Sequence, residues 1–260
     1  MDWQKLRGYC ICVLAAVTAQ QQLPCHSQTQ EAEMPKREKV FYLKIEPRLY
    51  NSGSNLETYG GVIRLGATMK APNNTTIFEI GPQALSYNNQ PVKSLDTVLA
   101  SYWSINKAIE IYGEWNNSWI DGYGNQSFYN TAKVGSVLRF NGGAVDVNQF
   151  SGLASLSKGH YLKVEQQGST IGNFSWTGNR STARLGWASR GKRWSLALEA
   201  GFAFTHDIYN GERYSPSGLF QLNYDLTRTQ QLFVSYYPEL KPFITGPMRG
   251  EFSLSFVQRF

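Results

Sequence analysis

Histidine is the side chain best suited to proton transfer near neutral pH, and this sequence has three: His26, His160 and His206. A hydrolytic site would need one of them beside a serine nucleophile or within a cluster of Asp and His side chains. Asp207 follows His206, but adjacent residues on a strand point to opposite faces and make a poor hydrogen-bonded pair. No serine is spaced to meet His160, and His26 lies in a polar N-terminal stretch. We therefore expect polar loop histidines and no catalytic residue.

The sequence also lacks the Cys/His spacing of a metal site and the glycine-rich loop of a phosphate site. Two of its three cysteines, Cys10 and Cys12, lie in an N-terminal apolar run that we expect to be cleaved, so Cys25 has no partner for an internal disulfide. We expect no metal, no cofactor and no nucleic-acid partner.

Much of the chain alternates apolar and polar residues with a period of two. The stretch 194–204 is the clearest, because apolar residues from Trp194 to Phe204 occupy every second position. The same alternation appears in 41–48, 63–69, 109–115, 132–140, 182–187 and 218–226. Each stretch predicts a β-strand with one apolar and one polar face. No window approaches the ~18 to 20 consecutive apolar residues of a membrane helix.

The N-terminal residues have the layout of an export signal. Lys5 and Arg7 precede a short apolar run, and Val17-Thr18-Ala19 fits the small-residue rule for cleavage. We predict a signal peptide over 1–19, a disordered periplasmic lead-in over 20–39, and one folded domain over 40–260.

The last nine residues place apolar side chains at Phe252, Leu254, Phe256 and Phe260, and only Gln258 breaks the alternation. This tail resembles the carboxy-terminal insertion signal of bacterial outer-membrane β-barrels, and the alternating strands resemble that class over the whole mature chain. The resemblance implies an all-β fold, an antiparallel up-and-down transmembrane β-barrel in the Gram-negative outer membrane. It also implies contacts with outer-membrane lipids, lipopolysaccharide and the barrel-assembly machinery. A soluble β-sandwich or lipocalin-like barrel is the competing interpretation, but it would turn its apolar alternates inward.

Connection lengths give a second test, because such barrels have short periplasmic turns and longer outer loops. We expect long connections at 239–249, 206–215 and 116–126, and short ones at 227–229, 189–192, 141–144 and 105–107. The strand number is then even, within the range of ten to fourteen. It is fourteen if Tyr161–Gln167 and Asn173–Thr177 are both strands and twelve if they belong to a loop; we favour twelve, because both are too short to cross a bilayer.

The polar faces of these strands would line the barrel interior. Cations and carboxylates are nearly balanced there, which does not indicate the strongly basic wall of an anion pore. Inward aromatic residues at Tyr112, Tyr161, Phe233 and Tyr237 would serve either as sugar-stacking surfaces or as bulk that fills the interior. The charged candidates for lining the lumen are Lys44, Arg48, Arg64, Glu110, Glu114, Lys133, Arg139, Lys163, Arg184, Glu199 and Asp225.

Three functions remain open. The leading hypothesis is a narrow porin-like channel or accessory barrel for transport or export of a hydrophilic solute, such as an anionic saccharide or polysaccharide, contacted by inward Arg and Lys. The second is a non-channel barrel used for envelope structure, adhesion or surface interaction. The third is a membrane-embedded hydrolase.

Overall fold

The computed structural model describes residues 38–260 apart from 52–56, 88–89, 123–124, 141–158, 173–174, 209–210 and 240–248. The predicted signal peptide and residues 20–37 of the predicted lead-in lie outside these residues. The first strand begins at Glu38, two residues before the predicted start of the folded domain.

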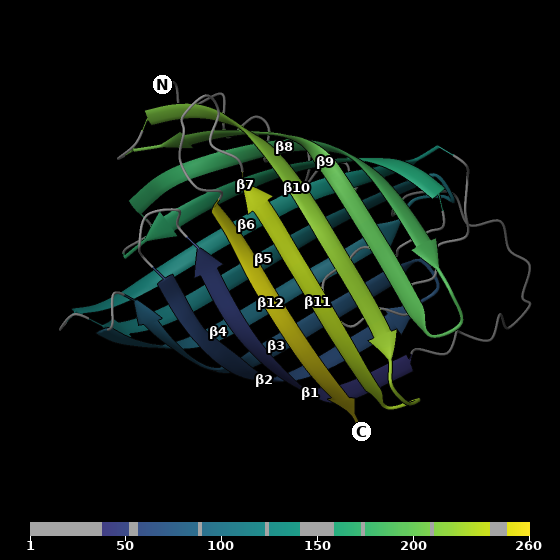
Figure 1. Cartoon of the computed structure of the whole chain (residues 1–260), viewed down its shortest axis with the longest axis horizontal. Helices are drawn as coiled ribbons and strands as arrows, with labels where there is room; N and C mark the ends of the chain where they lie inside the picture. Colours follow the sequence, from purple (N-terminus) through teal and green to yellow (C-terminus); the bar gives the residue numbers. More distant parts are fainter. Residues whose placement is uncertain are drawn as a thin grey trace, which may run out of the picture. The chain divides into compact units, whose positions relative to one another are not determined.

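The described residues form twelve antiparallel strands, which close into a barrel (Figure 1). Every strand pairs with its neighbours along the chain, and β1 pairs with β12, so no sheet edge is left open. The predicted up-and-down barrel of about twelve strands is confirmed. The strands are β1 (Glu38–Asn51), β2 (Glu57–Ala71), β3 (Asn74–Tyr87), β4 (Gln90–Ser104), β5 (Ile109–Gly122), β6 (Asn125–Arg139), β7 (Gly159–Ile171), β8 (Ser175–Arg190), β9 (Trp194–Asp207), β10 (Gly211–Asp225), β11 (Gln230–Glu239) and β12 (Arg249–Arg259).

The two faces of the wall have opposite character. On the outward face, Leu65, Leu185 and Phe202 are 62%, 62% and 68% exposed, whereas their chain neighbours Arg64 and Arg184 are buried in the interior. An outward surface of large apolar side chains is stable against lipid and unstable against water. Among the described residues, no helix is long and apolar enough to cross a membrane.

Aromatic side chains gather at both rims of the outward face. We call the rim where β1 begins and β12 ends the terminal end, and the other rim the distal end. Trp103 and Trp194 are exposed near the terminal end, and Tyr59, Trp119 and Tyr214 are exposed toward the distal end. Two aromatic girdles flanking an apolar band are typical of a barrel that spans a bilayer.

The assignment of Tyr161–Gln167 to a loop is wrong, although the strand count of twelve is right. These residues lie within β7, which pairs with β6 from Tyr161 to Ile171. Polar or small residues at His160, Gln166 and Gly168 occupy positions of the apolar face, so the alternation is visible only in the middle of the strand. Residues 175–177 similarly open β8.

Several predicted connections also differ. Residues 116–126 were expected to form a long loop but continue β5 and β6, which are joined by 123–124. Likewise β9 extends to Asp207 and β10 starts at Gly211, where a long loop was predicted. Backbone pairing continues into these polar stretches because ladder hydrogen bonds do not require apolar side chains. At the terminal end, β6 ends at Arg139 and β7 begins at Gly159, so that connection is longer than the predicted 141–144.

Candidate functional site in the barrel interior

The interior wall is rich in charged side chains that are largely covered by their neighbours. Eleven charged residues were predicted to line the lumen, and all stand at inward positions of their strands. Among the ion-paired ones, the Lys133 side chain keeps the largest accessible fraction, 27%, followed by Arg48 at 17% and Glu114 at 16%. Those below 9% exposure are Lys44, Arg64, Glu110, Arg139, Arg184 and Glu199.

One ion-pair network joins β1 to β4. Arg64 lies between Glu79, at 3.4 Å, and Asp96, at 3.1 Å. Lys44 lies 2.8 Å from Glu46 and 3.8 Å from Glu79. The sequence alternation did not single out Glu79 and Asp96, because apolar inward residues next to them, such as Ile77, interrupt the polar face.

The same network also crosses the junction between β1 and β12, where the barrel closes. Arg48 pairs with Glu46, and the Ser255 hydroxyl donates to Glu46 Oε2 at 2.7 Å. Ser255 belongs to β12, so a carboxylate of the first strand is bound by a side chain of the last. Asp225, Glu110 and Arg139 lie nearer the terminal end, where Arg139 pairs with Glu110 at 3.1 Å.

A second network joins β7, β8 and β9. The Arg184 guanidinium lies 2.7 Å from Glu165 and 2.7 Å from Glu199. Lys163 approaches the same two carboxylates, at 3.4 Å and 3.9 Å. Two cations therefore share two carboxylates, as Lys44 and Arg64 share Glu79 in the first network.

In each network, a carboxylate accepts a hydrogen bond from a tyrosine whose ring packs over a glycine of the next strand. Tyr161 pairs in register with Gly186, whose missing side chain leaves room for the ring: a Cβ there would lie 2.2 Å from it. The hydroxyl then reaches the strand beyond and donates to Glu199 at 2.9 Å. Two further triplets have the same order and comparable contacts: Tyr42, Gly66 and Glu79, and Tyr112, Gly135 and Glu165.

The two halves of the barrel repeat these residues. Tyr-Leu-Lys-Ile-Glu at 42–46 of β1 returns as Tyr-Leu-Lys-Val-Glu at 161–165 of β7, and Arg-Leu-Gly at 64–66 of β2 returns at 184–186 of β8. The sixth strand ends in Val-Leu-Arg at 137–139 and is followed by Phe140, and the twelfth ends in Val-Gln-Arg at 257–259 and is followed by Phe260. Equivalent strands are six apart, on opposite sides of a closed twelve-stranded ring.

The turns of the two halves match as well. Between β4 and β5, Asn106 Oδ1 accepts hydrogen bonds from the amides of Ala108 and Ile109, at 2.8 and 2.9 Å. Between β10 and β11, Thr227 Oγ1 accepts from the amides two and three residues further on, at 3.2 and 3.0 Å. We call 38–140 the first half and 159–260 the second half; the interior they enclose has approximate two-fold symmetry.

Buried aromatic and aliphatic side chains line the interior between these networks and the terminal end. Of the four aromatic candidates, Tyr112, Tyr161 and Phe233 are buried, and Tyr102 stacks on Tyr112 with ring centroids 5.6 Å apart. Their rings serve as bulk and not as open stacking surfaces. Tyr237, toward the distal end, is 39% exposed.

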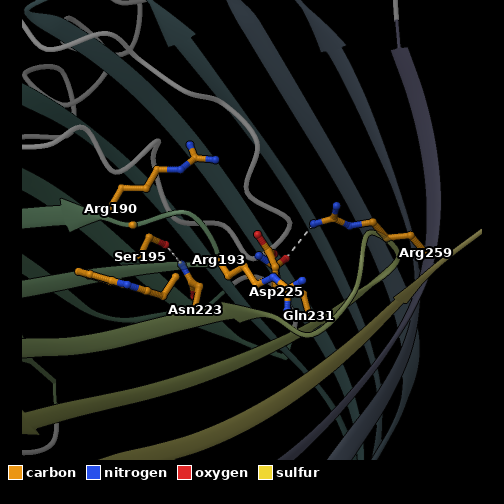
Figure 2. Close-up of a pocket in the computed structure, with 9 residues that line it drawn as sticks. Arg190, Arg193, Ser195, Asn223, Asp225, Gln231 and Arg259 are labelled. Carbon is orange, nitrogen blue, oxygen red and sulfur yellow. Dashed lines mark hydrogen bonds between the residues drawn. The ribbon is translucent and has the colours of Figure 1, made fainter.

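A pocket of about 260 Å³ lies at the terminal end of the second half (Figure 2). Figure 2 shows Arg259 extending from the end of β12 toward Asp225 and Gln231, with Arg190 at the end of β8 on the other side. Arg259 donates to Gln231 Oε1 at 3.0 Å, and Asn223 donates to Ser195 at 2.9 Å. The lining consists of Arg190, Gly191, Arg193, Trp194, Ser195, Asn223, Asp225, Gln231 and Arg259.

The histidines and the terminal strand lie away from this interior. His206 Nδ1 lies 3.3 Å from the exposed Glu212, and its ring stacks on Trp176. His160 is exposed on the outward face of β7, in register with Trp187. No group of three metal-ligating side chains occurs in the part of the chain that the structure describes. The predicted insertion-signal residues Phe252, Leu254, Phe256 and Phe260 stand on the outward face, where Phe260 is 76% exposed.

No protein-family model and no curated protein sequence matches this chain. Among solved structures, the barrel is similar to an outer membrane channel from Pseudomonas putida F1, with a TM-score of 0.54 and 10% identity over 90% of this chain and 100% of that one. It is also similar to the translocator domain of autotransporter NalP from Neisseria meningitidis, with a TM-score of 0.52 and 8% identity over 99% and 97% of the two chains. The fold is that of bacterial outer-membrane β-barrels, and its apolar outer face suits that membrane.

Proposed function

We propose that this barrel is a narrow outer-membrane channel for a hydrophilic solute. One observation carries the proposal: the Lys133 and Glu114 side chains face the interior midway along their strands and remain 27% and 16% exposed. A wall that is polar and still accessible to water supports passage of a polar solute, whereas a filled barrel would cover such side chains completely.

The charges around that space are arranged in pairs. Arg184 and Lys163 are balanced by Glu165 and Glu199, and Arg64 by Glu79 and Asp96. A wall of neutralised pairs gives weak selectivity between small cations and anions. Large buried side chains next to it make the passage narrow.

Planar-bilayer recording of the purified full-length protein tests this proposal. We expect small conductance steps with weak ion selectivity in the wild type. Lys133→Gln leaves Glu114 without its cation at 3.4 Å, so we expect its channels to prefer cations. An exposed cation in the turn after β10, Arg228, gives a matched control as Arg228→Gln. Absence of conductance steps would refute the channel, and identical selectivity in Lys133→Gln and the wild type would refute the role of the Lys133–Glu114 pair in lining it.

The proposal assigns no catalysis to the histidines. His206 contacts a carboxylate and an aromatic ring, and within the described residues neither His206 nor His160 is hydrogen-bonded to a serine side chain. We expect the wild type to hydrolyse neither lipid nor peptide substrates. Hydrolysis by the wild type that disappears in His206→Ala or His160→Ala would support an enzyme instead.

A further inference from the structure

The pocket at the terminal end of the second half has a counterpart in the first half that is closed. The matching turns after β4 and β10 make Asn223 the counterpart of Tyr102, and strand pairing agrees, because Tyr102 faces Tyr112 and Asn223 faces Phe233. The Tyr102 ring is only 5% exposed and fills the place in the first half that corresponds to the pocket. The shorter Asn223 leaves space at the same place in the second half.

The charged side chains at the pocket and at its counterpart in the first half differ too. In the first half, Arg139 is paired with the buried Glu110 at 3.1 Å. In the second half the counterpart of Arg139 is Arg259, but the counterpart of Glu110 is Gln231, a neutral amide of nearly the same shape. A carboxylate that balances an arginine in one half is thus replaced by an amide in the other.

The lining of the pocket is cationic as a result. It carries three guanidinium groups, from Arg190, Arg193 and Arg259, and a single carboxylate, from Asp225. The remaining polar groups are the uncharged side chains of Ser195, Asn223 and Gln231, all of them buried. Guanidinium groups bind phosphate and carboxylate oxygens in bidentate geometry, and the amide groups beside them can donate to the same oxygens.

We propose that this pocket binds an oxyanion, a phosphate or a carboxylate, carried by the hydrophilic solute at the terminal mouth of the barrel. The proposal rests on the channel function for the source of the anion, but the pocket's affinity can be measured without transport. Its position at the mouth, past the ion-pair networks of the interior, places three guanidinium groups and one carboxylate where an anionic group would enter or leave.

Calorimetric titration of the full-length barrel in neutral detergent tests the proposal, with inorganic phosphate and glucuronate as probes and glucose as the uncharged comparison. We expect the wild type to bind at least one of the two anions and not glucose. Gln231→Glu restores the carboxylate present in the first half with almost no change of shape, and we expect it to weaken binding at least about tenfold. Arg228→Gln removes an exposed cation outside the pocket and should leave the affinity unchanged.

Asn223→Tyr provides a second variant, because it closes the pocket with the residue that fills the first half. We expect it to abolish binding, while heat-modifiable migration on a gel reports whether the barrel has folded. Equal affinity in the wild type and Gln231→Glu would overturn the proposal, as would a wild type that binds neither probe. A barrel that conducts but does not bind would refute the pocket alone, and one that binds but does not conduct would refute the channel alone.

Discussion

Arg184→Gln is the substitution with the largest expected effect on the stability of the barrel. Its guanidinium lies 2.7 Å from both Glu165 and Glu199, and the side chain is only 9% exposed. Glutamine removes the charge and leaves two buried carboxylates with Lys163, at 3.4 and 3.9 Å, as their remaining cation. Removing one partner of a buried ion pair costs ~3–5 kcal/mol. Because Lys163 remains, we expect a loss of about 3 kcal/mol in the free energy of unfolding.

Approximate two-fold symmetry supplies the comparison. Arg64 holds the equivalent position but contacts its carboxylates at longer distances, 3.4 and 3.1 Å. Coulomb attraction weakens with distance, so we expect Arg64→Gln to cost less, about 2 kcal/mol. The double variant Arg184→Gln, Glu199→Gln leaves Glu165 paired one to one with Lys163, at 3.4 Å, and should recover most of the lost stability.

The assay is equilibrium unfolding in urea, with tryptophan fluorescence of the detergent-solubilised barrel as the signal. Arg228→Gln, in an exposed turn, should lie within about 0.5 kcal/mol of the wild type. The reasoning is refuted if Arg184→Gln unfolds at the wild-type midpoint. It is also refuted if the double variant is no more stable than Arg184→Gln alone, because the loss would then not come from uncompensated charge.

Three further outcomes follow from the same contacts. Tyr161→Phe removes the hydroxyl that donates to Glu199 and should cost about 1.5–3 kcal/mol in urea unfolding, whereas an unchanged midpoint would show that this hydrogen bond contributes nothing. Gly186→Ala places a methyl group 2.2 Å from the Tyr161 ring and should lower the free energy of unfolding by roughly 1–3 kcal/mol. Gly168→Ala, with open space around it, should leave that free energy unchanged, and equal effects of the two substitutions would contradict the packing of the ring on the glycine. Phe260→Ala should lower the fraction of heat-modifiable, membrane-inserted barrel, whereas Phe140→Ala, in the same Val-x-Arg-Phe context inside the chain, should not; equal yields would show that terminal position is irrelevant.

The faces of the strands were accessible from the sequence because side chains alternate with a period of two. Lys44 and Arg64 follow apolar residues in clear alternation, and both are inward in the structure. Where the alternation is interrupted, the prediction failed. Glu79 was not predicted to face inward because the inward residue Ile77 next to it is apolar. Most of β7 was not predicted as a strand because several of its outward residues are polar.

The internal repeat was also present in the sequence and was missed. Its conserved blocks are three to five residues long and stand about 120 residues apart, with different residues between them. Blocks of that length recur by chance in strand-rich sequences. The structure identifies them as a repeat because equivalent residues make equivalent contacts, as Tyr42 with Glu79 and Tyr161 with Glu199 do.

By itself, the sequence determined the class of fold and the inward face of each strand whose alternation is unbroken, since both follow from local periodicity. Only the tertiary structure decided which charges meet, because Arg184 and its two carboxylates come from three strands whose register is set by long-range backbone pairing. The same pairing places Tyr102 and Asn223 at equivalent positions of the two halves. Tyr102 fills that position in the first half, whereas a pocket lies beside Asn223 in the second. Position along the chain specifies the side chain, and the register of the closed sheet specifies its partner.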